Sequence, residues 1–152
     1  MLLIPSMAEY ISPVGGAYAM RWFRKERKPD VWETVDIQPA GDIEAAHTIR
    51  EICASAGAIA QHMTSVHGSK SEQEQASDAE RYQAAIKCAL EIASKISDDA
   101  MRDISVSQII RLCVGVNHLK TARVLLRAIQ SEPTRAGLIA DHPALVDQEA
   151  AN

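Results

Sequence analysis

Apolar residues recur every three or four positions along most of the chain after residue 41. This spacing places them on one side of an α-helix. The runs with this spacing predict about five helices, over residues 42–67, 77–96, 99–116, 119–129 and 131–140. Asp42, Ser77 and Ser131 stand where N-capping residues are expected, and Asn117 marks a turn. The pattern therefore predicts an all-α domain over residues 42–146, followed by a frayed tail over 147–152.

Residues 1–41 lack this periodicity and hold four of the six prolines, so they are predicted to be irregular. Within them, residues 31–37 are the best candidate for a short strand. Further along, residues 69–76 are polar with no apolar side, which predicts a mobile loop. No basic residue precedes the apolar start Leu2–Ile4, and prolines and glycines interrupt the stretch after it. Neither a signal peptide nor a membrane-spanning helix is therefore predicted, and a membrane is not an expected partner.

The composition narrows the kind of core and the cellular setting. Aromatic residues make up only 4% of the chain, so alanine and the aliphatic residues must fill the core, which suits close helix packing better than a sheet. The net charge of −4 does not indicate a chain that coats nucleic acid or membranes. Cys53, Cys88 and Cys113 lie far apart within apolar helical runs. They predict buried free thiols in a reducing compartment, which points to the cytoplasm.

The chain also matches itself when one helical segment is aligned with a later one. Residues 87–96 align with residues 120–129, and the register continues into the next helix. The matching pairs include Lys87 with Lys120, Ala89 with Ala122, Ile92 with Leu125, Ile96 with Ile129, and Arg102 with Arg135. A period of about 33 residues with two helices per unit is typical of helical repeat arrays.

The residues that carry this match resemble a known family. Ala89-x-x-x-Ala93-x-x-Ile96, followed by Asp98-x-x-x-Arg102-Asp103, resembles degenerate TPR-like (tetratricopeptide-like) repeats over about Ser77 to Ala140. The resemblance implies antiparallel helical hairpins stacked into a right-handed superhelix, with a concave surface that binds peptides or helices. An ordinary antiparallel bundle, whose helices match because they share alanine and isoleucine, is the alternative. Both are all-α.

No motif for catalysis or metal binding emerges from the sequence. The histidines form no H-E-x-x-H, the cysteines form no C-x-x-C, and there is no P-loop or G-x-S-x-G. Asp98, Asp99 and Asp103 are close enough to suggest an acidic metal site, but helix capping explains them. The protein is therefore expected not to be an enzyme and to need no cofactor or metal.

Two features point to charged partners. Residues 108–126 resemble a helix-turn-helix, although Arg111 and Thr121 stand where a small and an apolar residue are expected. A DNA-binding regulator is thus the alternative function, and Lys120, Arg123 and Arg127 would form its basic face. A second basic run contains Trp22, Arg24 and Lys25, and basic residues mixed with aromatics can hold anionic lipid or nucleic acid. The residues singled out as possible interaction sites are Trp22, Arg24, Lys25, Lys120, Arg123 and Arg127.

The leading expectation is a protein-interaction module, either an adaptor or an oligomerisation domain. The apolar residues of the last helical segment, Leu138, Ile139, Leu145 and Val146, need cover. Either the N-terminal segment with Trp22, Phe23 and Trp32 folds back over them, or a second copy or another protein docks there. Association is the favoured outcome, because the N-terminal segment is rich in proline.

Overall fold

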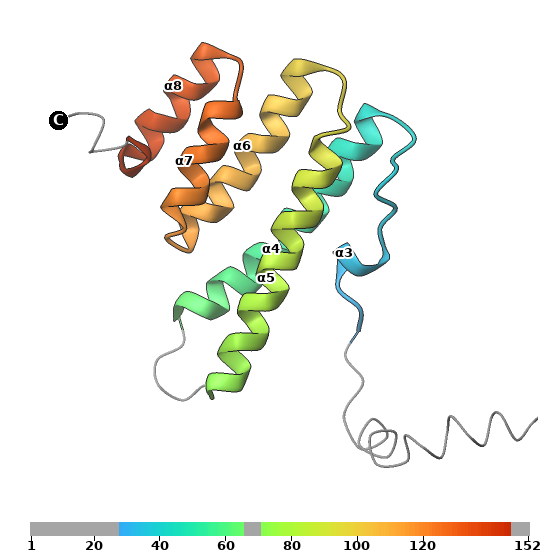
Figure 1. The fold of residues 1–152 in the computed structure, drawn as a ribbon, viewed down its shortest axis with the longest axis vertical. Helices are drawn as coiled ribbons and strands as arrows, with labels where there is room; N and C mark the ends of the chain where they lie inside the picture. The colour runs from blue at the N-terminus through green and yellow to red at the C-terminus, as the bar shows by residue number, and fades with distance from the viewer. Residues whose placement is uncertain (1–27, 66–70, 147–152) are drawn as a thin grey trace, which may run out of the picture.

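The computed structural model describes residues 28–65 and 71–146 of the chain, and in these residues every regular element is a helix (Figure 1). The prediction of an all-α protein is therefore confirmed. The elements are α3 (Val31–Thr34), α4 (Asp42–Ser65), α5 (Glu72–Ala93), α6 (Asp99–Gly115), α7 (Leu119–Ala128), α8 (Glu132–Asp141) and the short 3-10 helix η1 (Pro143–Leu145). Trp22, Phe23, Arg24, Lys25 and the tail after Val146 lie outside the described residues.

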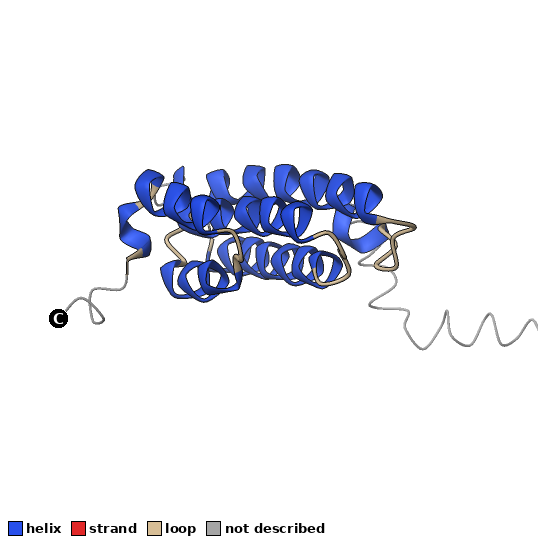
Figure 2. Ribbon diagram, turned by 90° about the horizontal axis from the view of Figure 1, so that it is seen from above, coloured by secondary structure: helices blue, strands red, loops and turns tan. Residues whose placement is uncertain are grey.

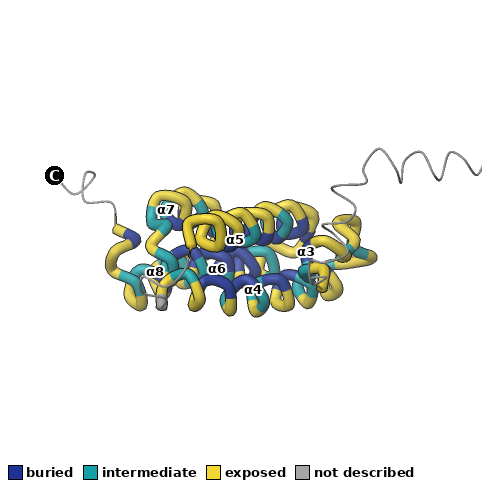
Figure 3. Tube along the Cα trace, turned by 90° about the horizontal axis from the view of Figure 1, so that it is seen from below, coloured by how far each residue is buried: buried dark blue, intermediate teal, exposed yellow. Residues whose placement is uncertain are grey.

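The helices form two layers. Figures 2 and 3 show α4, α6 and α8 side by side in one layer, with α5 and α7 in the other. Helix α6 contacts α4 and α8 within its own layer and α5 and α7 across it. Consecutive helices run in opposite directions, so α4 and α6 are parallel neighbours (Figure 1). Helix α6 is thus the central element, and the core lies between the two layers.

The start of α5 differs from the prediction. The helix begins at Glu72, and Ser71 is its N-cap, with the Ser71 hydroxyl accepting the backbone N–H of Glu74 at 3.1 Å. The predicted capping box at Ser77 and the predicted loop over residues 72–76 were wrong. Glutamate, glutamine and alanine are strong helix formers, so this stretch is helical although it has no apolar side. Residues 69 and 70 of the predicted loop lie outside the described residues.

The turn between α6 and α7 falls at Asn117, as predicted. The φ of this residue, +64°, is left-handed, a conformation that asparagine tolerates better than most residues. The backbone N–H of Asn117 donates to the carbonyl of Val114, and that of His118 donates to the carbonyl of Cys113. This pair of bonds is a Schellman motif, which satisfies the last carbonyls of α6 and ends the helix.

The short strand predicted over residues 31–37 is instead a single turn of helix, α3. Glu33 accepts the backbone N–H of Asp30 at 2.9 Å and so closes the first turn. The Trp32 side chain is buried, and α3 contacts both α4 and α5. Trp32 therefore covers the end of the layers formed by α4 and α5. Of the two alternatives for covering the last helix, the one in which Trp32 folds back over it does not occur.

The last helical segment is covered by its own continuation. Leu138 and Leu145 are buried, Ile139 is half-buried and Val146 is exposed. The 3-10 helix η1 turns back and contacts both α7 and α8, which brings Leu145 into the core cluster. These contacts remove the reason for expecting another molecule at this end. Self-association itself stays a prediction.

Two aspartates hold the loops that lead into α6 and α8. The Asp42 carboxylate accepts the backbone N–H groups of Ser97 and Asp98 at 3.0 and 2.9 Å, and the Ser97 hydroxyl at 2.9 Å. The Asp103 carboxylate accepts the backbone N–H groups of Gln130 and Ser131 at 3.1 and 2.8 Å. Asp42 is therefore not the N-cap that the sequence predicted. It is the first residue of α4 and binds a loop that is distant in sequence.

The loops before α6 and α8 also form equivalent hydrogen bonds at positions 33 residues apart, the spacing of the repeat in the sequence. Arg102 donates to the carbonyl of Ile96 and pairs with Asp99. Arg135 in the same way donates to the carbonyl of Ile129 and pairs with Glu132. Each following helix also has a side-chain N-cap, in which Asp98 accepts the N–H of Met101 and Ser131 accepts that of Thr134. The match in sequence is therefore accompanied by equivalent bonds, while membership of the TPR-like family stays a prediction.

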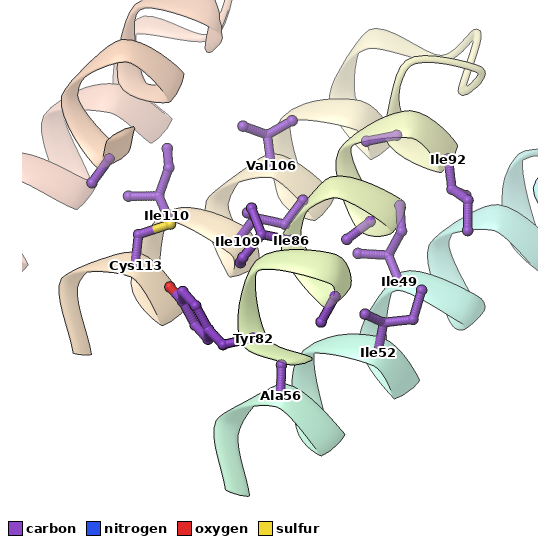
Figure 4. Close-up of a cluster of buried hydrophobic side chains, with 14 of the residues drawn as sticks. Ile49, Ile52, Ala56, Tyr82, Ile86, Ile92, Val106, Ile109, Ile110 and Cys113 are labelled. Carbon is purple, nitrogen blue, oxygen red and sulfur yellow. The ribbon is translucent and has the colours of Figure 1, made fainter. Parts of the chain in front are cut away.

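The core between the layers is built from aliphatic side chains and one tyrosine (Figure 4). Ile92 is fully buried, but its counterpart in the sequence match, Leu125, is only half-buried. Helix α7 is short and lies at the end of its layer (Figure 3), which leaves Leu125 less covered than Ile92. Ala89 and Ala122, the paired alanines, are both buried and allow close helix approach.

Ile92→Ala should lower the free energy of unfolding by about 2–5 kcal/mol, because it removes a fully buried side chain and leaves a cavity. Urea unfolding of the purified protein measures the change. Ile104→Ala is the control, since Ile104 is largely exposed and should cost less than about 0.5 kcal/mol. Equal losses in the two variants would contradict this assignment of the core.

The stability of the protein should depend on the charge of Asp42. Hydrogen bonds from Ser97 and Asp98 hold the pKa of this carboxyl below its ordinary value. The contribution of the carboxylate is therefore present above the unfolded-state pKa near 3.8 and is lost as the pH falls through the lower folded-state pKa. Asp42→Asn should destabilise the protein in urea unfolding at neutral pH and narrow the gap in stability between neutral and strongly acidic pH. An equal effect of the substitution at both pH values would show that the charge does not matter.

Candidate protein-interaction surface

Two large apolar side chains are exposed on the outer side of the layer formed by α4 and α6. Ile43 on α4 is 75% exposed and Ile104 on α6 is 59% exposed. Each is followed two helical turns later, and therefore on the same side, by an exposed arginine: Arg50 on α4 and Arg111 on α6. We call these four residues the Ile–Arg face.

The two halves of the Ile–Arg face occupy corresponding positions. Ile104 and Arg111 directly match Ile43 and Arg50 when the loop-binding Asp103 is aligned with Asp42. In each helix the aspartate reaches the loop that enters the next helix of its layer. The residue after it is rotated by about 100° and so points away from that loop. The same local arrangement thus exposes an isoleucine on both helices.

The hydrogen bonds of Asp42 also fix how the two halves lie along the helices. They place the start of α4 beside Asp98, the N-cap of α6. With a rise of about 1.5 Å per residue, Ile104 lies about 9 Å along α6 from Asp98, and Arg50 lies about 12 Å along α4 from Asp42. Ile104 and Arg50 are therefore within about 3 Å of the same height on neighbouring parallel helices. Apolar and basic side chains consequently alternate across the face.

The charges of the arginines on this face are not neutralised by described residues. Neither Arg50 nor Arg111 forms an ion pair with any residue in the described part of the chain. The acidic residue next to Arg50 in the sequence, Glu51, lies 3.7 Å from His47. The Ile–Arg face therefore presents unneutralised positive charge beside exposed apolar surface.

The interaction residues predicted on α7 lie on the opposite layer. Lys120 and Arg127 are exposed, with Val124, 54% exposed, between them on the same side of the helix. Arg123 is half-buried, and its guanidinium donates to the carbonyl of Ala144 at 2.8 Å. The structure therefore brings two of the three predicted basic residues to one exposed surface and uses the third to hold the end of η1.

The segment that resembles a helix-turn-helix forms the hairpin of α6 and α7. Figure 1 shows these helices side by side and running in opposite directions. In this hairpin Arg111 lies on the outer side of one layer, whereas Thr121, Lys120 and Arg127 lie on α7 in the other layer. A DNA-binding role for this segment would therefore depend on α7 alone.

A chain of charged side chains at the other end of the molecule was not foreseen from the sequence. Arg81 on α5 donates to both carboxylate oxygens of Asp30, at 2.9 and 2.6 Å, and lies 3.7 Å from Asp78. Asp78 in turn lies 3.0 Å from Nδ1 of His62 on α4. The bond to Asp30 is the main cause of the raised pKa of Arg81. These groups hold α3 and α4 against α5, which is a structural role.

The cysteines do not form a nucleophilic site within the described residues. All three are free, and burial raises the pKa of Cys53 to about 11 and raises those of Cys88 and Cys113 as well. Nucleophilic cysteines need a lowered pKa, so these thiols have the opposite character. The buried Tyr82 hydroxyl points toward the sulfur of Cys113 (Figure 4), and burial raises its pKa too.

The described part of the chain contains no cluster of three or more His, Cys, Asp or Glu side chains that could bind a metal ion. None of its helices combines the length and apolar character needed to cross a bilayer. Comparison with family models, curated proteins and solved structures returned no significant match. The candidate site therefore rests on the geometry of the Ile–Arg face.

The raised thiol pKa values predict slow alkylation of the folded protein. At pH 8, Cys53 should react with iodoacetamide on the order of 100-fold more slowly in the folded protein than in urea, because the thiolate is the reacting form. Cys113, which is buried, should be slowed as well. Time-resolved labelling followed by peptide mass spectrometry measures both rates. Equal rates for Cys53 in the two conditions would contradict the prediction.

Proposed function

We propose that this protein is a non-enzymatic protein-interaction module, and that the Ile–Arg face of α4 and α6 contacts the partner. The observation that carries the proposal is the repetition of one exposed isoleucine and one unpaired arginine on two neighbouring parallel helices. A single exposed isoleucine is ordinary on a protein surface. The same pair at corresponding positions, with free charge beside it, is the pattern of a contact surface.

The magnitudes indicate how such a surface would act. Covering one exposed isoleucine side chain contributes about 1.5–3 kcal/mol, whereas an ion pair at an exposed site contributes about 0.2–1 kcal/mol. The isoleucines would therefore supply most of the affinity. The arginines would select the partner and set its orientation, since charge complementarity acts mainly on specificity and association rate.

The resemblance to TPR-like repeats supports the same proposal, because it implies a concave surface that binds peptides or helices. The equivalent bonds of Arg102 and Arg135 support two helix pairs of similar construction. A cytoplasmic adaptor fits the free cysteines, which persist in a reducing compartment. Oligomerisation through another surface is compatible with this role.

A helix-turn-helix DNA-binding regulator is the second candidate, and the exposed Lys120 and Arg127 on α7 favour it. It has one basic residue fewer than the sequence suggested, because Arg123 is engaged with Ala144. Binding of duplex DNA that is abolished by Lys120→Ala with Arg127→Ala would support this candidate over the first.

The protein-interaction proposal can be tested with the double variant Ile43→Ser with Ile104→Ser. Proteins captured from a cell lysate by the wild-type chain should be reduced at least about tenfold, because the variant loses two apolar side chains that the partner would cover. Quantitative mass spectrometry measures the captured proteins. Circular dichroism should show an unchanged fold, since both isoleucines are exposed.

The matched control is Val124→Ser, which removes an exposed apolar side chain from the opposite layer. This variant should capture the same proteins as the wild type. Capture that survives the double isoleucine substitution but is lost with Val124→Ser would move the interaction surface to α7.

A further inference from the structure

The chemistry of the partner can be inferred from the charges of the Ile–Arg face. The inference rests on the proposed function and adds to it. Arg50 and Arg111 are exposed, two turns beyond their isoleucines, and have no ion-pair partner in the described residues. A partner that covers Ile43 and Ile104 must also accept or avoid these two guanidinium groups.

Two possible occupants from the chain itself fit poorly. A second copy that docks face to face would bring two further arginines into the same interface, and like charges at an interface are unfavourable. The segment before the described residues carries Arg21, Arg24, Lys25 and Arg27 against a single nearby acidic residue, Glu26. That segment has the same sign of charge as the face and would be repelled by it.

We propose that the Ile–Arg face binds an acidic, apolar peptide segment of a partner protein, in which Asp or Glu side chains meet Arg50 and Arg111 while aliphatic or aromatic side chains cover Ile43 and Ile104. Arginine suits this role because its planar guanidinium can donate two hydrogen bonds to one carboxylate. Packed neighbouring helices lie about 8–10 Å apart, so a partner would present the apolar and the acidic contact about three residues apart in an extended peptide, or about two turns apart in a helical one.

The experiment is a selection from a random 12-residue peptide library displayed on phage, with the immobilised full-length chain as bait. The enriched peptides should combine Asp or Glu with Leu, Ile, Val, Phe or Met and carry a net negative charge. One enriched peptide is then synthesised, and its binding is measured by fluorescence anisotropy. Binding should weaken as salt is added, because the ion pairs are exposed.

The charge contacts are tested with Arg50→Glu with Arg111→Glu, which should weaken binding of the synthetic peptide at least tenfold. The matched control is Lys120→Glu with Arg127→Glu, which makes the same change in net charge on the opposite layer. This control should change the affinity less than twofold. Both variants alter exposed side chains, and circular dichroism checks that each is folded.

The outcomes separate this inference from the proposed function. Enriched peptides that are neutral or basic, or acidic peptides weakened equally by both charge reversals, would overturn the inference. If those peptides still lose binding with Ile43→Ser and Ile104→Ser, the protein-interaction role stands without the acidic preference. A selection that enriches no peptide sequence would count against both. Duplex DNA binding that requires Arg50 and Arg111 would replace the acidic peptide with a nucleic acid.

Discussion

The arrangement of the helices depends on backbone N–H groups at the two loops that lead into α6 and α8. Donors at a helix N-terminus have no partner within the helix, and a side-chain cap satisfies only part of them. Asp98 and Ser131 cap their own helices, while Asp42 and Asp103 reach across from the preceding helix of the same layer to accept the amides just before and at the cap. Each aspartate therefore joins two helices that are distant in sequence and fixes their relative height.

The exposed Ile–Arg face follows from this constraint. Because each aspartate points along its layer toward the loop, the rotation of its helix about the helix axis is fixed. The next residue, about 100° further round, therefore points away from the core. That residue is an isoleucine in both helices, Ile43 and Ile104, although a polar residue there would be compatible with the fold. The helix geometry accounts for the exposure of this position. It does not explain why this position is isoleucine in both helices, which is why we propose that the face contacts a partner.

Much of the fold could be predicted from local sequence signals. The ends of α6 and the start of α8 were correct because Asp98, Asn117 and Ser131 act within their own turn. The signals that failed are those that need distant neighbours. Asp42 has the appearance of a local N-cap but binds the loop at Ser97 and Asp98, and no pattern around Asp42 reveals that loop.

The candidate site was harder to predict from the sequence than the fold. Ile43 lies three residues before Ala46 and six before Ile49, so spacing alone groups it with the apolar positions, although the rotation of about 100° per residue places it about 120° from the buried Ile49. The packing of α5 and α6 against α4 shows which side of the helix is buried. The prediction that Arg123 would be a free interaction residue was wrong for a similar reason: its hydrogen-bond partner, the carbonyl of Ala144, comes from the distant helix η1. Long-range contacts therefore decided which apolar and basic residues remained on the surface.

The end of the layers formed by α7 and α8 shows where a partner is not required. One repeat period after Asp103 the chain has Ala136, so α8 lacks an aspartate at the position that would hold the loop of a further helix. The chain instead turns back through η1, buries Leu145 against α7 and α8, and uses Arg123 to hold the carbonyl of Ala144. These contacts cover most of the apolar residues at this end. The surface with unused apolar and charged groups is thus the side of α4 and α6, where each exposed isoleucine has an arginine two turns away.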